Sequence, residues 1–164
     1  MSHFSVIARL LRLLSIFGAI FVLLQPSLTL AAVTIGAETV DLGPVVFRSP
    51  AEITWWKAIL SFLPNAIVAW GLVQLSLFGK HLTLGGRFTK AVSDSLRKAS
   101  FLFVIGVVIS WLVEPVISNQ SLVGAFVQLL ENHGLLLLIS LAFTLVATLL
   151  NEARDIEAEN KEFY

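Results

Sequence analysis

The sequence predicts an all-α membrane protein, a bundle of four transmembrane helices that forms one domain over residues 1–164. Composition is the first observation: 57% of the residues are apolar and 13% are charged, against roughly 25% charged residues in soluble domains. Four long apolar segments are the second observation, and a strong bias of Lys and Arg toward one set of segments is the third. The four segments leave no room for a separate soluble domain.

The four spans are expected at residues 6–24, 53–78, 101–117 and 135–150. In the first span, Arg9 and Arg12 precede a nearly unbroken apolar run that is expected to end before Pro26. A basic start, an apolar centre and small residues at Ala31 and Ala32 also fit a cleaved signal peptide, which is the alternative interpretation. We expect a retained helix.

The segment 26–52 is expected to be a short external loop. Alternation of polar and apolar residues at 39–42, and a second β-favouring run at 45–47 after a Gly-Pro pair, would suit a small β-hairpin. The second span then opens with Trp55-Trp56-Lys57, residue types that favour the membrane interface. Pro64 lies inside this span, where its missing N–H should bend the helix.

The remaining connections differ in charge. Residues 79–100 form a basic cytoplasmic connection whose second half, from Thr89 onward, is expected to be helical and to continue into the third span. Residues 121–132 suit a short surface helix that Gly134 would end. The fourth span carries a stripe of small polar residues suited to close helix packing: Ser140, Thr144 and Thr148. Residues 151–164 are expected to extend this span as a cytoplasmic tail helix.

Positive charge predicts that both termini are cytoplasmic. Under this orientation nine of the eleven Lys and Arg residues lie inside: Arg9, Arg12, Lys80, Arg87, Lys90, Arg97, Lys98, Arg154 and Lys161. Only Arg48 and Lys57 lie outside. The tail is acidic, so Glu152, Asp155 or Glu159 could pair with the basic connection at Arg87, Lys90, Arg97 or Lys98. The alternative is that these cations contact anionic lipid headgroups and that the tail is only solvated.

Three polar residues in or near the apolar spans are candidate functional residues. Glu114, near the external end of the third span, is an acid where carboxylates are costly and hence often functional. The other two, Asn65 and Gln74 in the second span, suit interhelical hydrogen bonds.

The residues for several other kinds of chemistry are missing from the sequence. There are no cysteines, and His3, His81 and His133 are far apart, so no metal or other cofactor is expected. No nucleophile elbow or phosphate-binding glycine motif occurs, which predicts a protein that is not an enzyme. No direct nucleic-acid binding is expected.

Two short segments carry a family resemblance. Gly86-Arg87-Phe88-Thr89 followed by Ser95-Leu96-Arg97-Lys98, and the closing segment Leu149 to Arg154 with Glu157, Glu159 and Asn160, resemble small four-helix bacterial membrane proteins catalogued as a domain of unknown function. The resemblance implies a bacterial cytoplasmic (inner) membrane protein, sometimes encoded beside a small helix-turn-helix regulator. It implies no activity and no catalytic residues.

Two functions fit these observations. The leading expectation is a non-enzymatic membrane protein, a sensor or modulator that acts through cytoplasmic contacts. The rival is a small transporter or channel subunit in which Glu114, Asn65 and Gln74, with the bend at Pro64, line a polar path. The lipid bilayer is the expected partner, and a homo-oligomer or a cytoplasmic protein partner is compatible with either function.

Overall fold

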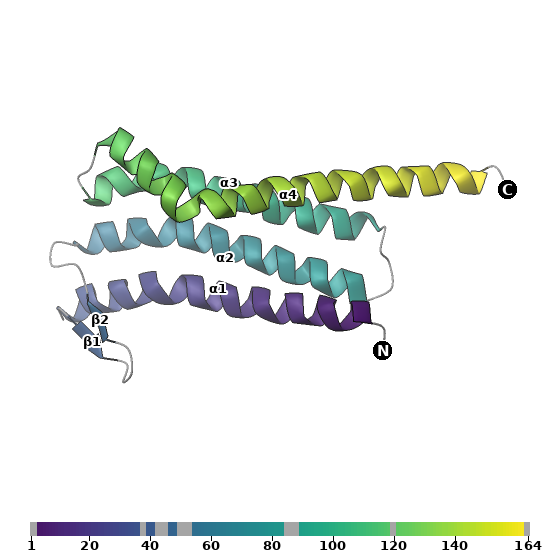
Figure 1. Ribbon diagram of the computed structural model, residues 1–164. Helices are drawn as coiled ribbons and strands as arrows, with labels where there is room; N and C mark the ends of the chain where they lie inside the picture. Colours follow the sequence, from purple (N-terminus) through teal and green to yellow (C-terminus); the bar gives the residue numbers. More distant parts are fainter. Residues whose placement is uncertain are drawn as a thin grey trace.

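The fold consists of four long helices and a small hairpin (Figure 1). The computed structural model describes residues 3–36, 39–41, 46–48, 54–83, 89–118 and 121–162. The elements are α1 (His3–Ile35), β1 (Thr39–Asp41), β2 (Val46–Arg48), α2 (Trp55–Thr83), α3 (Lys90–Ser118) and α4 (Leu122–Glu162). Each helix contains a stretch long and apolar enough to cross a membrane, which confirms the predicted number of long apolar helices.

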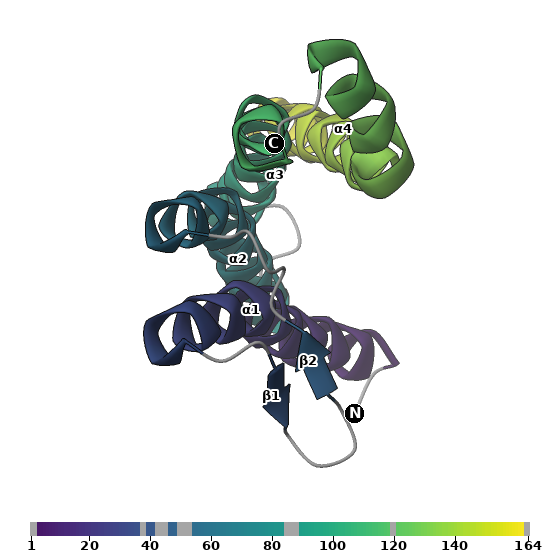
Figure 2. The same cartoon turned by 90° about the vertical axis from the view of Figure 1, so that its left-hand side faces the viewer.

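The helices pack in chain order as one open row. Contacts join α1 to α2, α2 to α3 and α3 to α4. Figure 2 looks along the helices and shows α1 and α4 at opposite ends of this row. Both termini lie at one end of the helices, and the hairpin lies at the other end (Figure 1). The bundle is therefore a layer, in which α2 and α3 are flanked on both sides.

The first helix is longer than predicted. The sequence pattern predicted a span that stops at residue 24 and a loop that begins at Pro26, but α1 continues through Pro26 to Ile35. The hydroxyls of Ser27, Thr29 and Thr34 donate to carbonyls four residues earlier, over 2.6, 3.1 and 2.7 Å, so these polar residues fit a helix. The helix ends at Gly36, whose φ of 70° is the left-handed conformation typical of a C-terminal cap.

The hairpin occupies part of the segment predicted as the external loop. Its strands pair antiparallel, with Thr39 opposite Arg48 and Asp41 opposite Val46. Both strands fall within or beside the two runs that the alternation singled out, and β1 contacts α1. The loop between the first two spans is shorter than predicted because α1 takes up its first ten residues.

The last helix is continuous where the sequence predicted a break. The short helix at 121–132 and the fourth span are both parts of α4, and Gly134 lies inside it. A single glycine costs a helix only about 1 kcal/mol, and a backbone surrounded by apolar groups has no better partners than its own helical hydrogen bonds. Figure 1 shows a bend in α4 between its green first part and the remainder, and its yellow end projects past the other helices.

The core lies where α2, α3 and α4 meet. Val92, Leu96 and Phe103 of α3 are almost completely buried, and the Phe103 ring lies 6.4 Å from that of Phe143 on α4. On the other side of Phe103 is Gly71 of α2. A glycine there lets the ring fit between the two helices, so Gly71 and Phe103 together set the spacing of α2 and α3.

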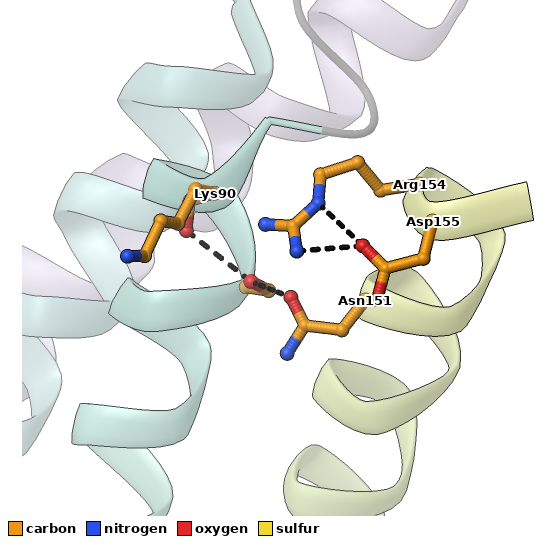
Figure 3. Close-up of polar contacts among 5 residues, drawn as sticks. Lys90, Asn151, Arg154 and Asp155 are labelled. Carbon is orange, nitrogen blue, oxygen red and sulfur yellow. Dashed lines mark hydrogen bonds and ion pairs between the residues drawn. The ribbon is translucent and has the colours of Figure 1, made fainter. Parts of the chain in front are cut away.

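Small polar residues join α3 to α4. The Ser100 hydroxyl lies 2.6 Å from both the Ser140 carbonyl oxygen and the Thr144 hydroxyl, so this part of the predicted small-residue stripe does pack closely. Thr148 is exposed and donates to the Thr144 carbonyl of its own helix. Farther along, Ser93 on α3 lies 2.6 Å from Oδ1 of Asn151 on α4 (Figure 3).

The start of α2 is tied to the end of α3. The Lys57 ammonium donates to the Ile117 carbonyl over 3.0 Å and lies 5.8 Å from the centre of the Trp56 ring. A cation is favourable at a helix C-terminus because it satisfies an unpaired carbonyl and complements the helix dipole. This bond holds α2 against α3 at the hairpin end of the row.

Candidate functional site: a polar cavity among the helices

A cavity of about 460 Å³ lies toward the hairpin end of the helix row. All four helices contribute to its wall: Gln25, Pro26 and Thr29 from α1; Ser61, Pro64, Asn65 and Val68 from α2; Gly106, Val107, Ser110, Val113, Glu114 and Ile117 from α3; and Asn132 and His133 from α4. Its volume is in the range of pockets that hold small molecules. Polar side chains in an otherwise apolar helix layer make it the strongest candidate site.

Each of the first three helices supplies a pair of polar residues spaced four apart. The pairs are Gln25 and Thr29, Ser61 and Asn65, and Ser110 and Glu114. Residues four apart lie on the same helical face, so each pair presents a short polar strip toward one point. Three strips converge on a single cavity.

Glu114 and His133 bring two ionisable groups into the cavity from neighbouring helices. Both side chains are half-buried. His133 Nε2 lies 3.4 Å from the Ser110 hydroxyl, at the long limit of a hydrogen bond, and Ser110 is one turn from Glu114 on α3. The carboxylate and the imidazole can both exchange hydrogen bonds with a bound solute.

Two prolines line the same cavity from different helices. Pro26 and Pro64 have no N–H, so the carbonyls of Val22 and Leu60 receive no helical hydrogen bond from these positions. Asn65, next to Pro64, donates its Nδ2 to the Ser61 carbonyl over 2.9 Å, which leaves its Oδ1 as an acceptor. Asn65 Oδ1 is therefore an acceptor in the cavity wall that a polar solute could use.

The structure brings together two of the three polar candidates. Glu114 and Asn65 line the cavity, but Gln74 does not. Nine residues are about two and a half helical turns, so Gln74 lies on the face of α2 opposite Asn65. The interhelical hydrogen bonds predicted for Asn65 and Gln74 do not occur within the described ranges, and the side-chain hydrogen bond of Asn65 to Ser61 stays inside α2.

The charged candidates lie at the other end of the helices. Lys90, Arg97 and Lys98 line a second groove, on α3, and Arg87 lies outside the described residues. Glu152, Asp155 and Glu159 are exposed on α4. Asp155 pairs with its neighbour Arg154 over 2.7 Å (Figure 3). No ion pair joins the tail to Lys90, Arg97 or Lys98 in the part of the chain that the structure describes.

The geometry of the cavity suits hydrogen bonding better than nucleophilic catalysis. Ser110 is in the middle of α3, where backbone N–H groups are committed to helical hydrogen bonds and cannot stabilise an oxyanion. Among the described residues no three His, Asp or Glu side chains gather as a metal site would require. What the cavity offers is a carboxylate, an imidazole, amides and hydroxyls around a small, partly open volume.

Most of this site was not predicted from the sequence, including His133, Asn132 and Gln25. The spacing of the polar pairs on the first three helices was the available signal, but it identifies a cavity only once the helices are placed side by side. Comparison of the chain with protein-family models, with curated proteins and with solved structures gives no match.

Proposed function

We propose that this chain is a non-enzymatic, multi-pass membrane protein that binds a small cationic solute in the polar cavity, as a transporter or channel subunit. The observation that carries the proposal is the convergence of Glu114, His133 and Asn65 in one cavity among apolar helices. A carboxylate in a low-dielectric setting attracts positive charge more strongly than it would in water. Amides and hydroxyls in the wall would orient the solute by hydrogen bonds.

Exposed apolar side chains support placement in a bilayer. Leu14, Phe17 and Phe21 of α1, and Leu141 and Leu145 of α4, are each more than 60% exposed. Apolar surface of this extent marks contact with lipid or with another protein. The positive-inside bias favours cytoplasmic termini, and with that orientation the cavity would lie in the half of the bilayer away from the cytoplasm.

Replacing Glu114 is expected to weaken the binding of small cations. The wild-type protein in lipid nanodiscs should be stabilised against heat by ethylammonium or tetramethylammonium, and not by ethanol or tert-butanol, which are uncharged molecules of similar size. Glu114→Gln removes the charge but keeps the shape, and should weaken cation binding about tenfold or more. Isothermal titration would give the dissociation constants.

Glu131→Gln is the matched control for this experiment. Glu131 is an exposed acid of α4 outside the cavity wall, so its loss changes net charge equally. Equal loss of binding in both variants would show that the net charge of the protein, rather than the carboxylate in the cavity, attracts the cations. No stabilisation of the wild type by either ammonium ion would also contradict the proposal.

The projecting tail of α4 favours a second candidate function. The tail passes the ends of the other helices (Figure 1), and its acids Glu152, Asp155 and Glu159 are exposed. A cytoplasmic protein with a basic surface could bind here, as a sensor or modulator would require.

Reversing the tail charge is expected to remove such a partner. The double variant Glu152→Lys/Glu159→Lys should lose a cytoplasmic protein that co-purifies with the wild type in mild detergent, and truncation after Asn151 should lose it too. Glu131→Lys, at the opposite end of α4, should retain it. Recovery of only lipid and copies of the chain from every variant would contradict a tail-dependent partner.

A further inference from the structure

A groove of about 690 Å³ lies between α3 and α4, near the end of the helices where the termini are. Lys90, Arg97 and Lys98 line it, and all three are exposed. Within the described ranges none of these cations forms an ion pair, although the acidic tail of α4 begins close by. One carboxylate, that of Asp94, also lines the groove, so three cations and one acid leave it with a net positive charge.

The groove changes from charged to apolar along α3. Arg97 and Lys98 are followed one turn later by Phe101 and then by Val104, which are on the same side of the helix and line the same groove. Phe101 is 65% exposed. One helical turn rises about 5 Å. The cations and the apolar wall are therefore about as far apart as the phosphate of a lipid and its acyl chains.

Close packing of α3 on α4 forms the floor of this groove. The Ser100 hydroxyl, buried at 2% exposure, bonds to the Thr144 hydroxyl over 2.6 Å, and Thr144 lines the groove. Both hydroxyls also lie within hydrogen-bond distance of the Ser140 carbonyl oxygen, so they have partners within the helix pair and the floor makes no polar demand on an apolar occupant.

We propose that this groove binds an anionic phospholipid. The Arg97 guanidinium and the Lys98 ammonium hold the phosphate, and one acyl chain runs along Phe101 and Val104. Basic pockets between transmembrane helices on the cytoplasmic side are suited to anionic headgroups, and the charge bias favours that side here. Lipid binding requires only that the helices lie in a bilayer, so it is independent of a solute at Glu114.

Native mass spectrometry of the purified chain tests this site with defined lipids. Phosphatidylglycerol should bind about tenfold or more tightly than phosphatidylcholine with the same acyl chains. Arg97→Gln/Lys98→Gln should abolish the preference. Arg9→Gln/Lys80→Gln removes two exposed cations from α1 and α2 and should retain it.

A third variant separates the two parts of the site. Val104→Trp leaves the charge unchanged but fills the apolar part of the groove, and should reduce phosphatidylglycerol binding. Soluble glycerol phosphate should not compete at the concentration at which the lipid binds. The proposal is overturned if both lipids bind equally, if the Arg9/Lys80 control loses the preference as fully as the Arg97/Lys98 variant, or if glycerol phosphate displaces the lipid.

Discussion

Phe103→Ala should lower the free energy of unfolding by about 2 kcal/mol. Phe103 is 2% exposed and fills the space between Gly71 of α2 and Phe143 of α4, so its removal leaves a cavity where three helices meet. In the proposed bilayer the expected cost is below the roughly 3–5 kcal/mol typical of soluble proteins, because a side chain released from the packed helices would enter lipid rather than water. Only the packing contribution is lost.

Phe101→Ala is the matched control, two residues away on the same helix. Phe101 is 65% exposed and lies outside the buried core cluster, so the same truncation should change the free energy of unfolding little. Both variants can be unfolded with SDS in mixed micelles while helix content is followed by circular dichroism. Equal losses in the two variants would mean that Phe103 does not pack as the structure shows.

The helices could be predicted because their signal is local. A run of apolar residues long enough to cross a bilayer needs no knowledge of the rest of the chain. The errors came at Pro26 and Gly134, two residue types that break helices in water. In an apolar setting a backbone that leaves the helix loses hydrogen bonds that nothing replaces, so α1 and α4 continue through both positions.

The site was harder to predict than the helices because it is assembled between them. Glu114 was identified from its charge alone, whereas His133 lies in what the sequence presented as a connection and enters the cavity only because α4 is continuous. Gln74 was selected by residue type without regard to helical phase. Its position on the far face of α2 could have been predicted by counting turns from Asn65.

The open row of helices could not be predicted from the sequence either. The local sequence pattern does not indicate whether the first and last helices contact each other, because both helices carry apolar residues on several faces. The contacts that decide the arrangement involve small residues. Gly79 of α2 packs against α1, Gly71 of α2 packs against α3, and Gly106 of α3 packs against α2. Ser100 of α3 packs against α4. Small residues allow close approach but do not specify which helix approaches.

Gly79→Leu should separate α1 from α2 and lower the free energy of unfolding by about 1–3 kcal/mol. A Cβ at this position would lie 2.9 Å from the Ala8 carbonyl oxygen and 3.3 Å from the Arg12 backbone nitrogen, both in α1. A side chain in the way could rotate, but a helical backbone cannot yield without moving the whole helix. The strain must therefore be relieved by displacing α1.

Gly134→Leu is the control that isolates this contact. A Cβ at Gly134 would meet nothing within 4 Å, so the same substitution in α4 should leave stability unchanged or raise it through better helix propensity.

Displacement of α1 has a second consequence, because Gln25 and Thr29 of that helix form one wall of the polar cavity. Gly79→Leu should thus weaken cation binding as well as stability, whereas Gly134→Leu should weaken neither. SDS unfolding of both variants measures stability, and calorimetric titration measures cation binding. If Gly79→Leu is as stable as the wild type, α1 does not pack on α2 through this glycine, and the cavity is not closed on that side.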